Sequence, residues 1–82
     1  MDTQVLAGTG STCTAAQSNL SSLTLSEANL RCTNAGYAGV CGTGSLTYVG
    51  ACTWDANQHY YYRSGYRSFY CKECSVSNPC PN

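Results

Sequence analysis

Seven cysteines in a chain of 82 residues are the feature that most constrains what this chain can fold into. A domain of this size buries too little apolar surface for a core alone to leave much net stability, and such domains commonly add disulfides, a metal or a partner. Large aliphatic residues are also few, and isoleucine is absent. We therefore expect a disulfide-stapled domain. The candidate residues are Cys13, Cys32, Cys41, Cys52, Cys71, Cys74 and Cys80.

The odd cysteine count leaves one thiol over when the other six pair, and about 105 connectivities are then allowed. The sequence does not choose among them. We expect the spare thiol on the helical half of the chain, at Cys32 or Cys13, where it would be buried and inert. The alternative is a bond from the spare cysteine to a second chain.

The cysteine content and the net charge indicate the compartment of the protein and exclude some classes of partner. The cysteine density is typical of a secreted, cell-surface or periplasmic protein. Met1 precedes Asp2 directly, and we interpret it as an initiator in front of an already processed chain, with no signal peptide visible. Four basic and four acidic residues balance to zero, which disfavours nucleic-acid partners and cationic membrane disruption. No apolar run approaches a membrane span, so we expect no membrane insertion, while self-association stays open.

The N-terminal half predicts two short helices after a flexible arm or edge segment at residues 1–11. Two segments fit the capping-box pattern, Thr14 to Gln17 and Thr24 to Glu27. They predict helices over about residues 15–23 and 25–35, with Gly36 as the C-terminal stop. The second helix would place Cys32 on its buried stripe.

The second half of the domain, which extends over residues 12–82, predicts antiparallel strands. The segments YAGVC, LTYVGACTW, QHYYYR and YRSFYC are separated by short turn sequences, the spacing of a three- or four-stranded β-meander. A two-residue turn at Ser64-Gly65 would pair Arg63 with Tyr66 and Tyr60 with Phe69. The prolines around Cys80 cannot continue a ladder.

Alternation along this predicted hairpin sorts its side chains into two faces. The face expected in the core carries Gln58, Tyr60, Tyr62, Arg67, Phe69 and Cys71. The face expected in solvent carries His59, Tyr61, Arg63, Tyr66, Ser68 and Tyr70. Arg63 and Arg67 would each hold a facing tyrosine by a cation–π contact. In the preceding strand, Leu46, Tyr48, Gly50, Cys52 and Trp54 share a side that we expect to pack on the helices.

No pattern predicts catalysis or a cofactor. His59 is the only histidine and lies among tyrosines, and nothing nearby resembles a nucleophile elbow. The pair Cys71 and Cys74 favours structural disulfides, because a redox pair needs a helix N-terminus and a zinc site needs a second pair.

The expected fold is therefore a small α+β disulfide-rich domain, with two short N-terminal helices packed on an antiparallel β-meander. We expect a secreted or surface-exposed binding protein that recognises an extracellular protein or glycan by occupancy and is not an enzyme. The expected ligand-binding residues are His59, Tyr61, Arg63, Tyr66 and Tyr70. One alternative is a self-assembling extracellular structural subunit, linked through the odd cysteine. Another is a zinc-stabilised domain using Cys71, Cys74, Cys80 and either His59 or another cysteine.

Overall fold

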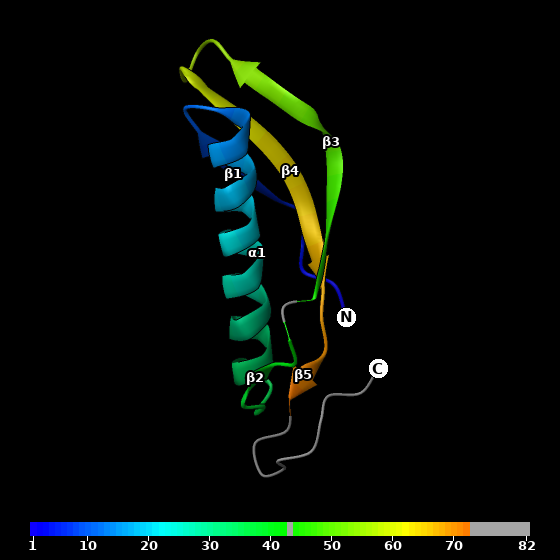
Figure 1. Ribbon diagram of the computed structural model, residues 1–82. Coiled ribbons are helices and arrows are strands. Elements are labelled where there is room, and N and C mark those ends of the chain that lie inside the picture. The colour runs from blue at the N-terminus through cyan, green and yellow to red at the C-terminus, as the bar shows by residue number, and fades with distance from the viewer. Residues whose placement is uncertain (43, 73–82) are drawn as a thin grey trace.

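One long helix lies along one face of a curved antiparallel sheet (Figure 1). The computed structural model describes residues 1–42 and 44–72. Its elements are β1 (Leu6–Gly10), α1 (Cys13–Asn34), β2 (Gly39–Val40), β3 (Ser45–Asp55), β4 (Tyr60–Ser68) and β5 (Cys71–Lys72). One sheet has the strand order β1-β4-β3, and β2 and β5 form a small second sheet. The α+β class and the antiparallel pairing are confirmed. The predicted β-meander is wrong, because β1 pairs with β4 and β2 pairs with β5, and only β3 and β4 are sequential neighbours among the described strands. No helix in the described ranges is long and apolar enough to cross a membrane.

Helix α1 is continuous, so the prediction of two short helices is wrong. It begins after Thr12, whose hydroxyl accepts a hydrogen bond from the Ala15 amide at 3.1 Å. The predicted second cap, Thr24, lies inside the helix and donates its hydroxyl to the Leu20 carbonyl at 2.9 Å. A threonine hydroxyl satisfied in this way does not cap, and tertiary packing of the surrounding turns decides that the helix continues.

The buried side of α1 is a row of residues spaced by four: Ala16, Leu20, Thr24, Ala28 and Cys32. The predicted burial of Cys32 is confirmed, with no exposed surface. Most members of the row are small, so the helix can approach the sheet closely. Gly8 on β1 makes this approach closer still, because a Cβ there would overlap the Ala16 carbonyl and lie 2.6 Å from the Leu20 Cβ.

The C-terminal end of the helix confirms the predicted stop at Gly36. Gly36 has a φ of 92°, a left-handed conformation that glycine adopts without a Cβ penalty. Its amide donates to the Thr33 carbonyl at 3.1 Å, and the Tyr37 amide donates to the Cys32 carbonyl at 2.9 Å. These two bonds are the pair of the Schellman motif.

Strand β4 runs straight through Ser64 and Gly65, so the predicted two-residue turn and its pairing are wrong. Arg63 pairs with Gly8 on β1 and Tyr66 pairs with Thr47 on β3. The chain reverses instead at residues 56–59, where two backbone amides donate to Asp55 Oδ1. A Cβ at Gly65 would lie 2.6 Å from a β3 carbonyl oxygen and 3.1 Å from Leu20 Cδ2. The glycine there serves close packing and not chain reversal.

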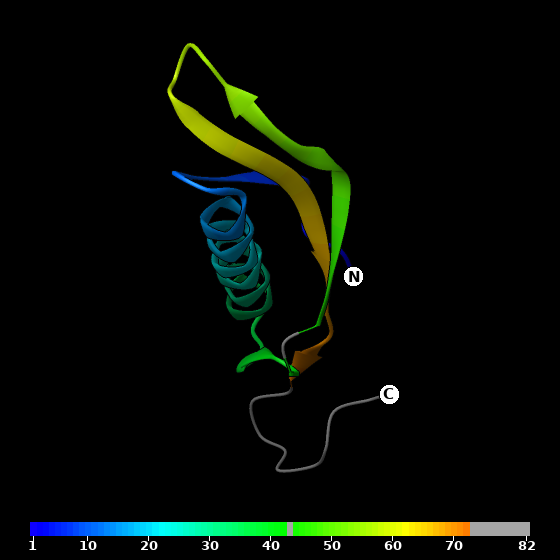
Figure 2. The same cartoon turned by 45° about the horizontal axis from the view of Figure 1, so that its top comes forward.

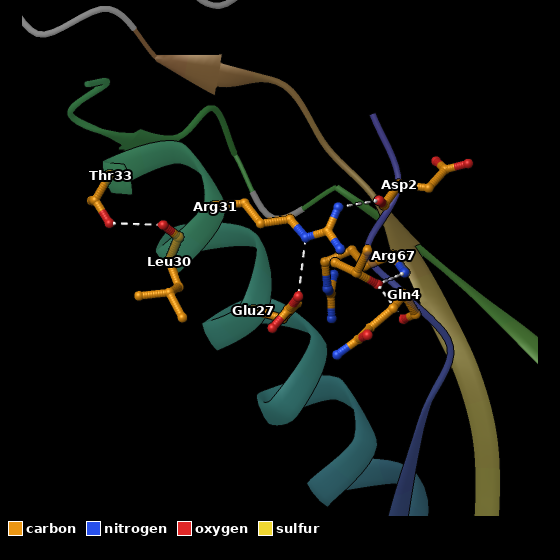
Figure 3. Close-up of polar contacts among 8 residues, drawn as sticks. Asp2, Gln4, Glu27, Leu30, Arg31, Thr33 and Arg67 are labelled. Carbon is orange, nitrogen blue, oxygen red and sulfur yellow. Dashed lines mark hydrogen bonds and ion pairs between the residues drawn. The ribbon is translucent and has the colours of Figure 1, made fainter. Parts of the chain in front are cut away.

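The N-terminal segment, expected to be a flexible arm or an edge segment, contains β1 at the edge of the sheet. Before β1, the Thr3 amide donates to the Arg67 carbonyl at 2.8 Å, and the Phe69 amide donates to the Met1 carbonyl at 2.7 Å. Arg31 of the helix reaches the same segment, since its Nη1 lies 3.4 Å from the Asp2 carbonyl oxygen (Figure 3). The segment is therefore hydrogen-bonded to both β4 and the helix.

Two disulfides fasten opposite ends of α1 to the sheet region, Cys13 to Cys52 and Cys32 to Cys71. Cys41 is disulfide-bonded as well. The prediction that Cys32 or Cys13 is the spare thiol is therefore wrong. The other two candidates, Cys74 and Cys80, lie outside the described residues.

The largest buried side chain is Phe69, which packs against Ala28 and Cys32 at the C-terminal half of the helix. The predicted core position of Phe69 is confirmed. Because the disulfide of Cys32 lies in this cluster, apolar packing and covalent bonding stabilise the same region.

Candidate functional site

Side chains alternate between the two faces of β4 along its whole length, because the strand is uninterrupted. Gly8 and Gly10 of β1 point toward the helix, since an added Cβ on either would collide with α1. Paired residues of neighbouring strands share a face, so their partners Arg63 and Tyr61 also lie on the helix side. The opposite, outer face of β4 carries Tyr60, Tyr62, Ser64, Tyr66 and Ser68.

The five predicted ligand-binding residues consequently do not share one face. Tyr61 and Arg63 lie on the helix side of the sheet, whereas Tyr66 lies on the outer face opposite Thr47. Tyr70 is exposed beyond the end of β4. His59 is in the turn, with a positive φ of 59°. The expected grouping depended on a turn at Ser64-Gly65, and without that turn every residue beyond it changes face relative to those before it.

The structure brings a different residue, Trp54 of β3, against two of the predicted ones. Trp54 is the direct partner of Tyr61 across the hairpin, and their ring centroids are 4.9 Å apart. The His59 ring meets the same indole with its centroid 6.4 Å away. Trp54 was expected on the side of β3 that faces the helix, but not among the ligand-binding residues. Its position immediately before the turn-forming Asp55 was the available indication.

Arg63 makes a cation–π contact, although with another tyrosine than the sequence predicted. Its guanidinium carbon lies 3.8 Å from the ring centroid of Tyr48 on β3. Its Nε also donates to the Gly50 carbonyl at 3.3 Å. Gly50 has a φ of 83° and belongs to an irregularity between Val49 and Thr53, where three β3 residues oppose Arg63 alone. The bulge turns a carbonyl toward Arg63 and fixes its guanidinium.

Arg67 does not take part in this site, and its predicted cation–π contact is wrong. Its side chain is buried against the helix. The guanidinium donates to Thr24 Oγ1 at 3.2 Å, to the Ser21 carbonyl at 3.1 Å and to Ser21 Oγ at 2.9 Å. Hydrogen bonding of this kind is what permits a buried charge, so Arg67 joins helix to sheet.

We use the name aromatic row for Tyr48, Trp54, His59, Tyr61 and Arg63, which lie on the helix side of the β3–β4 hairpin or in its turn. Tyr48 is 40% exposed and Trp54 is 47% exposed. The hairpin extends past the first turn of α1 (Figure 2), so its far end has no helix beneath it. The Cys13–Cys52 disulfide joins the base of this extension to the start of the helix. The row is therefore accessible and carried on an anchored hairpin.

The described residues contain no cluster of three or more histidine, cysteine or acidic side chains that would hold a metal. In addition, the zinc ligand set expected as an alternative includes Cys71, whose sulfur is bonded to Cys32. A cysteine that binds zinc must be a thiolate, so the disulfide-bonded Cys71 cannot serve as a ligand. A redox pair of Cys71 with Cys74 would need the same sulfur.

Comparisons with known proteins give this chain no relative. No protein-family model matches it, and no significant match is found among curated proteins or among solved structures.

Proposed function

We propose that this chain is a small secreted or surface-exposed binding protein that contacts an extracellular glycan or protein through the aromatic row. It acts by occupancy and carries out no chemistry. The observation that supports this most is the chain's only tryptophan, which is 47% exposed and packed on Tyr61 in a hairpin that extends beyond the helix. An indole left half in water by a small domain with few large apolar residues is available to a partner.

The anchoring of the hairpin supports recognition by a rigid surface. Tyrosine and tryptophan have few rotatable bonds and present flat amphipathic rings, so they lose little entropy on binding. The Trp54–Tyr61 contact, the Arg63 stack on Tyr48 and the Cys13–Cys52 bridge hold the row in place before a partner arrives. Preorganisation of this kind reduces the free-energy cost of binding.

The test uses the intrinsic fluorescence of Trp54, which reports on the row alone because the chain has no second tryptophan. Extracellular glycans, and proteins that contain no tryptophan, are titrated against the wild type, Tyr61→Ala and the matched outer-face variant Tyr60→Ala. We expect the ligands that shift the Trp54 emission to bind Tyr61→Ala at least roughly tenfold more weakly and Tyr60→Ala unchanged. Equal weakening by both tyrosine variants, or ligands that bind without any change in Trp54, would contradict the proposal.

One observation favours a second candidate function, a self-assembling extracellular subunit. β3 has 11 residues and lies at the edge of its sheet, paired only with β4 within the described part of the chain. An edge strand offers backbone groups to another chain, and Tyr60, Tyr62 and Tyr66 line the outer face beside it. Sedimentation over a hundredfold concentration range tests this idea. If the chain assembles, its sedimenting mass should rise with concentration. The Val49→Lys variant should stay closer to the monomer mass, since Val49 is exposed on β3.

A further inference from the structure

Arg63 is the polar group of the aromatic row that is best placed to receive a ligand. One face of its guanidinium rests on the Tyr48 ring, and its Nε is bonded to the Gly50 carbonyl. Within residues 1–42 and 44–72, its two terminal nitrogens make no hydrogen bond. A guanidinium fixed through Nε and one face still presents donors in the fork geometry that matches a carboxylate.

The charges around the row favour an anion. The carboxylate of Asp55, the nearest acidic residue in sequence, belongs to the outer face and accepts from the amides of Asn57 and Gln58. Glu27 lies far along the helix, ion-paired to Arg31 at 3.0 Å (Figure 3). The first turn of α1 contains no acidic residue, and the Cys13–Cys52 bridge brings this positive end of the helix dipole to the same side of the hairpin.

The spacing along β4 combines this cation with an apolar ring surface. Arg63 and Tyr61 are two positions apart on one face of the strand, about 6.6 Å along it. Trp54 lies directly opposite Tyr61. A ligand that reaches both needs a carboxylate and a flat apolar face held close together.

We infer that the aromatic row binds a carboxylated glycan, with a uronic acid carboxylate on the Arg63 terminal nitrogens and a sugar ring stacked on Trp54 and Tyr61. This inference rests on the proposed binding function and names its ligand class. A uronic acid holds a carboxylate and the C–H face of a ring in one rigid unit, so it matches the spacing without a large ordering cost. A flexible acidic peptide would lose more conformational entropy to present the same two groups.

The experiment titrates wild-type protein with two carboxylated probes, an oligogalacturonate and a hyaluronan oligomer, and with the methyl ester of the oligogalacturonate. Trp54 emission is the readout. The variants are Arg63→Gln, Arg63→Lys and the control Arg31→Gln, which removes a different exposed arginine. We expect a carboxylated probe to shift the emission, and Arg63→Gln to weaken its binding roughly tenfold to a hundredfold. The methyl ester should bind the wild type about as weakly as the acid binds Arg63→Gln.

Other outcomes separate the ligand class from the binding function. Arg63→Lys keeps the charge but loses the fork, so we expect binding between that of the wild type and Arg63→Gln. Equal affinity for acid and ester, an Arg63→Gln effect no larger than that of Arg31→Gln, or no response to either acid would overturn the carboxylated-glycan inference. If neutral glycans, proteins or an acidic peptide then shift Trp54 and depend on Tyr61, the binding function stands without it. If nothing depends on Tyr61, both fail.

Discussion

Replacing Gly8 with alanine tests the close approach of helix and sheet on which the fold depends. A Cβ at this position would overlap the Ala16 carbonyl oxygen and the Leu20 amide, and would lie 2.6 Å from the Leu20 Cβ. Two of these obstacles are backbone atoms, so α1 and β1 must move apart. Overpacking of this kind costs about 1–3 kcal/mol, and a rigid backbone obstacle places the Gly8→Ala loss near the upper value.

The total stability of a chain of 82 residues is about 4–12 kcal/mol at typical values per residue. A loss of about 3 kcal/mol would therefore remove a large part of it and lower the melting temperature by about 12–24 °C. Thermal and urea unfolding followed by far-UV circular dichroism measure the change. Ala7→Val, at an exposed neighbour on the other face of β1, is the matched control and should change stability by less than about 0.5 kcal/mol.

The sign of the stability change in Gly8→Ala separates overpacking from an effect on the unfolded chain. If only the entropy of the unfolded chain mattered, Gly8→Ala would stabilise the protein by about 0.4–1 kcal/mol. A variant as stable as the wild type, or more stable, would show that the helix does not rest on the Gly8 backbone.

Three further changes have expected outcomes. Thr24→Val should lower the free energy of unfolding in urea by about 1–3 kcal/mol, because the buried hydroxyl accepts a hydrogen bond from Arg67 Nε. The control Thr33→Val, at an exposed position, should lower it by less than about 0.5 kcal/mol. Equal losses in the two variants would contradict a buried hydrogen-bond network. A double serine variant that removes the Cys32–Cys71 bridge should lower the free energy of unfolding by about 3–4 kcal/mol, because the bridge closes a sequence separation of 39. An unchanged denaturation midpoint would refute this. Trp54→Ala should lower the free energy of unfolding by about 2 kcal/mol, because about half of its surface is buried. A loss above about 4 kcal/mol would identify the indole as core.

In the helical half of the chain, local sequence patterns predicted some features correctly and one wrongly. The buried position of Cys32 and the stop at Gly36 follow from helical spacing and from the backbone freedom of glycine, and both were predicted. The predicted break between two helices is absent from α1. The Thr24 hydroxyl donates to the Leu20 carbonyl, and Thr24 belongs to the continuous buried row of the helix. A capping box marks where a helix can begin. Whether it does depends on what the neighbouring turns pack against.

The candidate site shows where a local interpretation failed. Ser64-Gly65 resembles a hairpin turn, yet β3 supplies a partner strand along all of β4, and the helix presses on the Gly65 backbone. Because β4 has no turn there, Tyr61 and Arg63 lie on the opposite face from Tyr66, and Trp54 lies beside Tyr61. The tyrosines led the prediction to strand β4, but the faces depend on register, which a single misplaced turn reverses.

The sequence by itself determined that this is a small α+β domain held by disulfides. Its size, few large apolar residues and many cysteines predict the disulfides, and a helical pattern followed by short strand segments predicts the α+β class. It also determined the end of the helix and the buried positions of Cys32 and Phe69, which depend on spacing along one segment. Only the tertiary structure decided which cysteines are bonded, that one helix spans both predicted ones, and which rings stand beside Arg63. Each of these depends on contacts between segments far apart in the chain, and local propensity carries no information about such contacts.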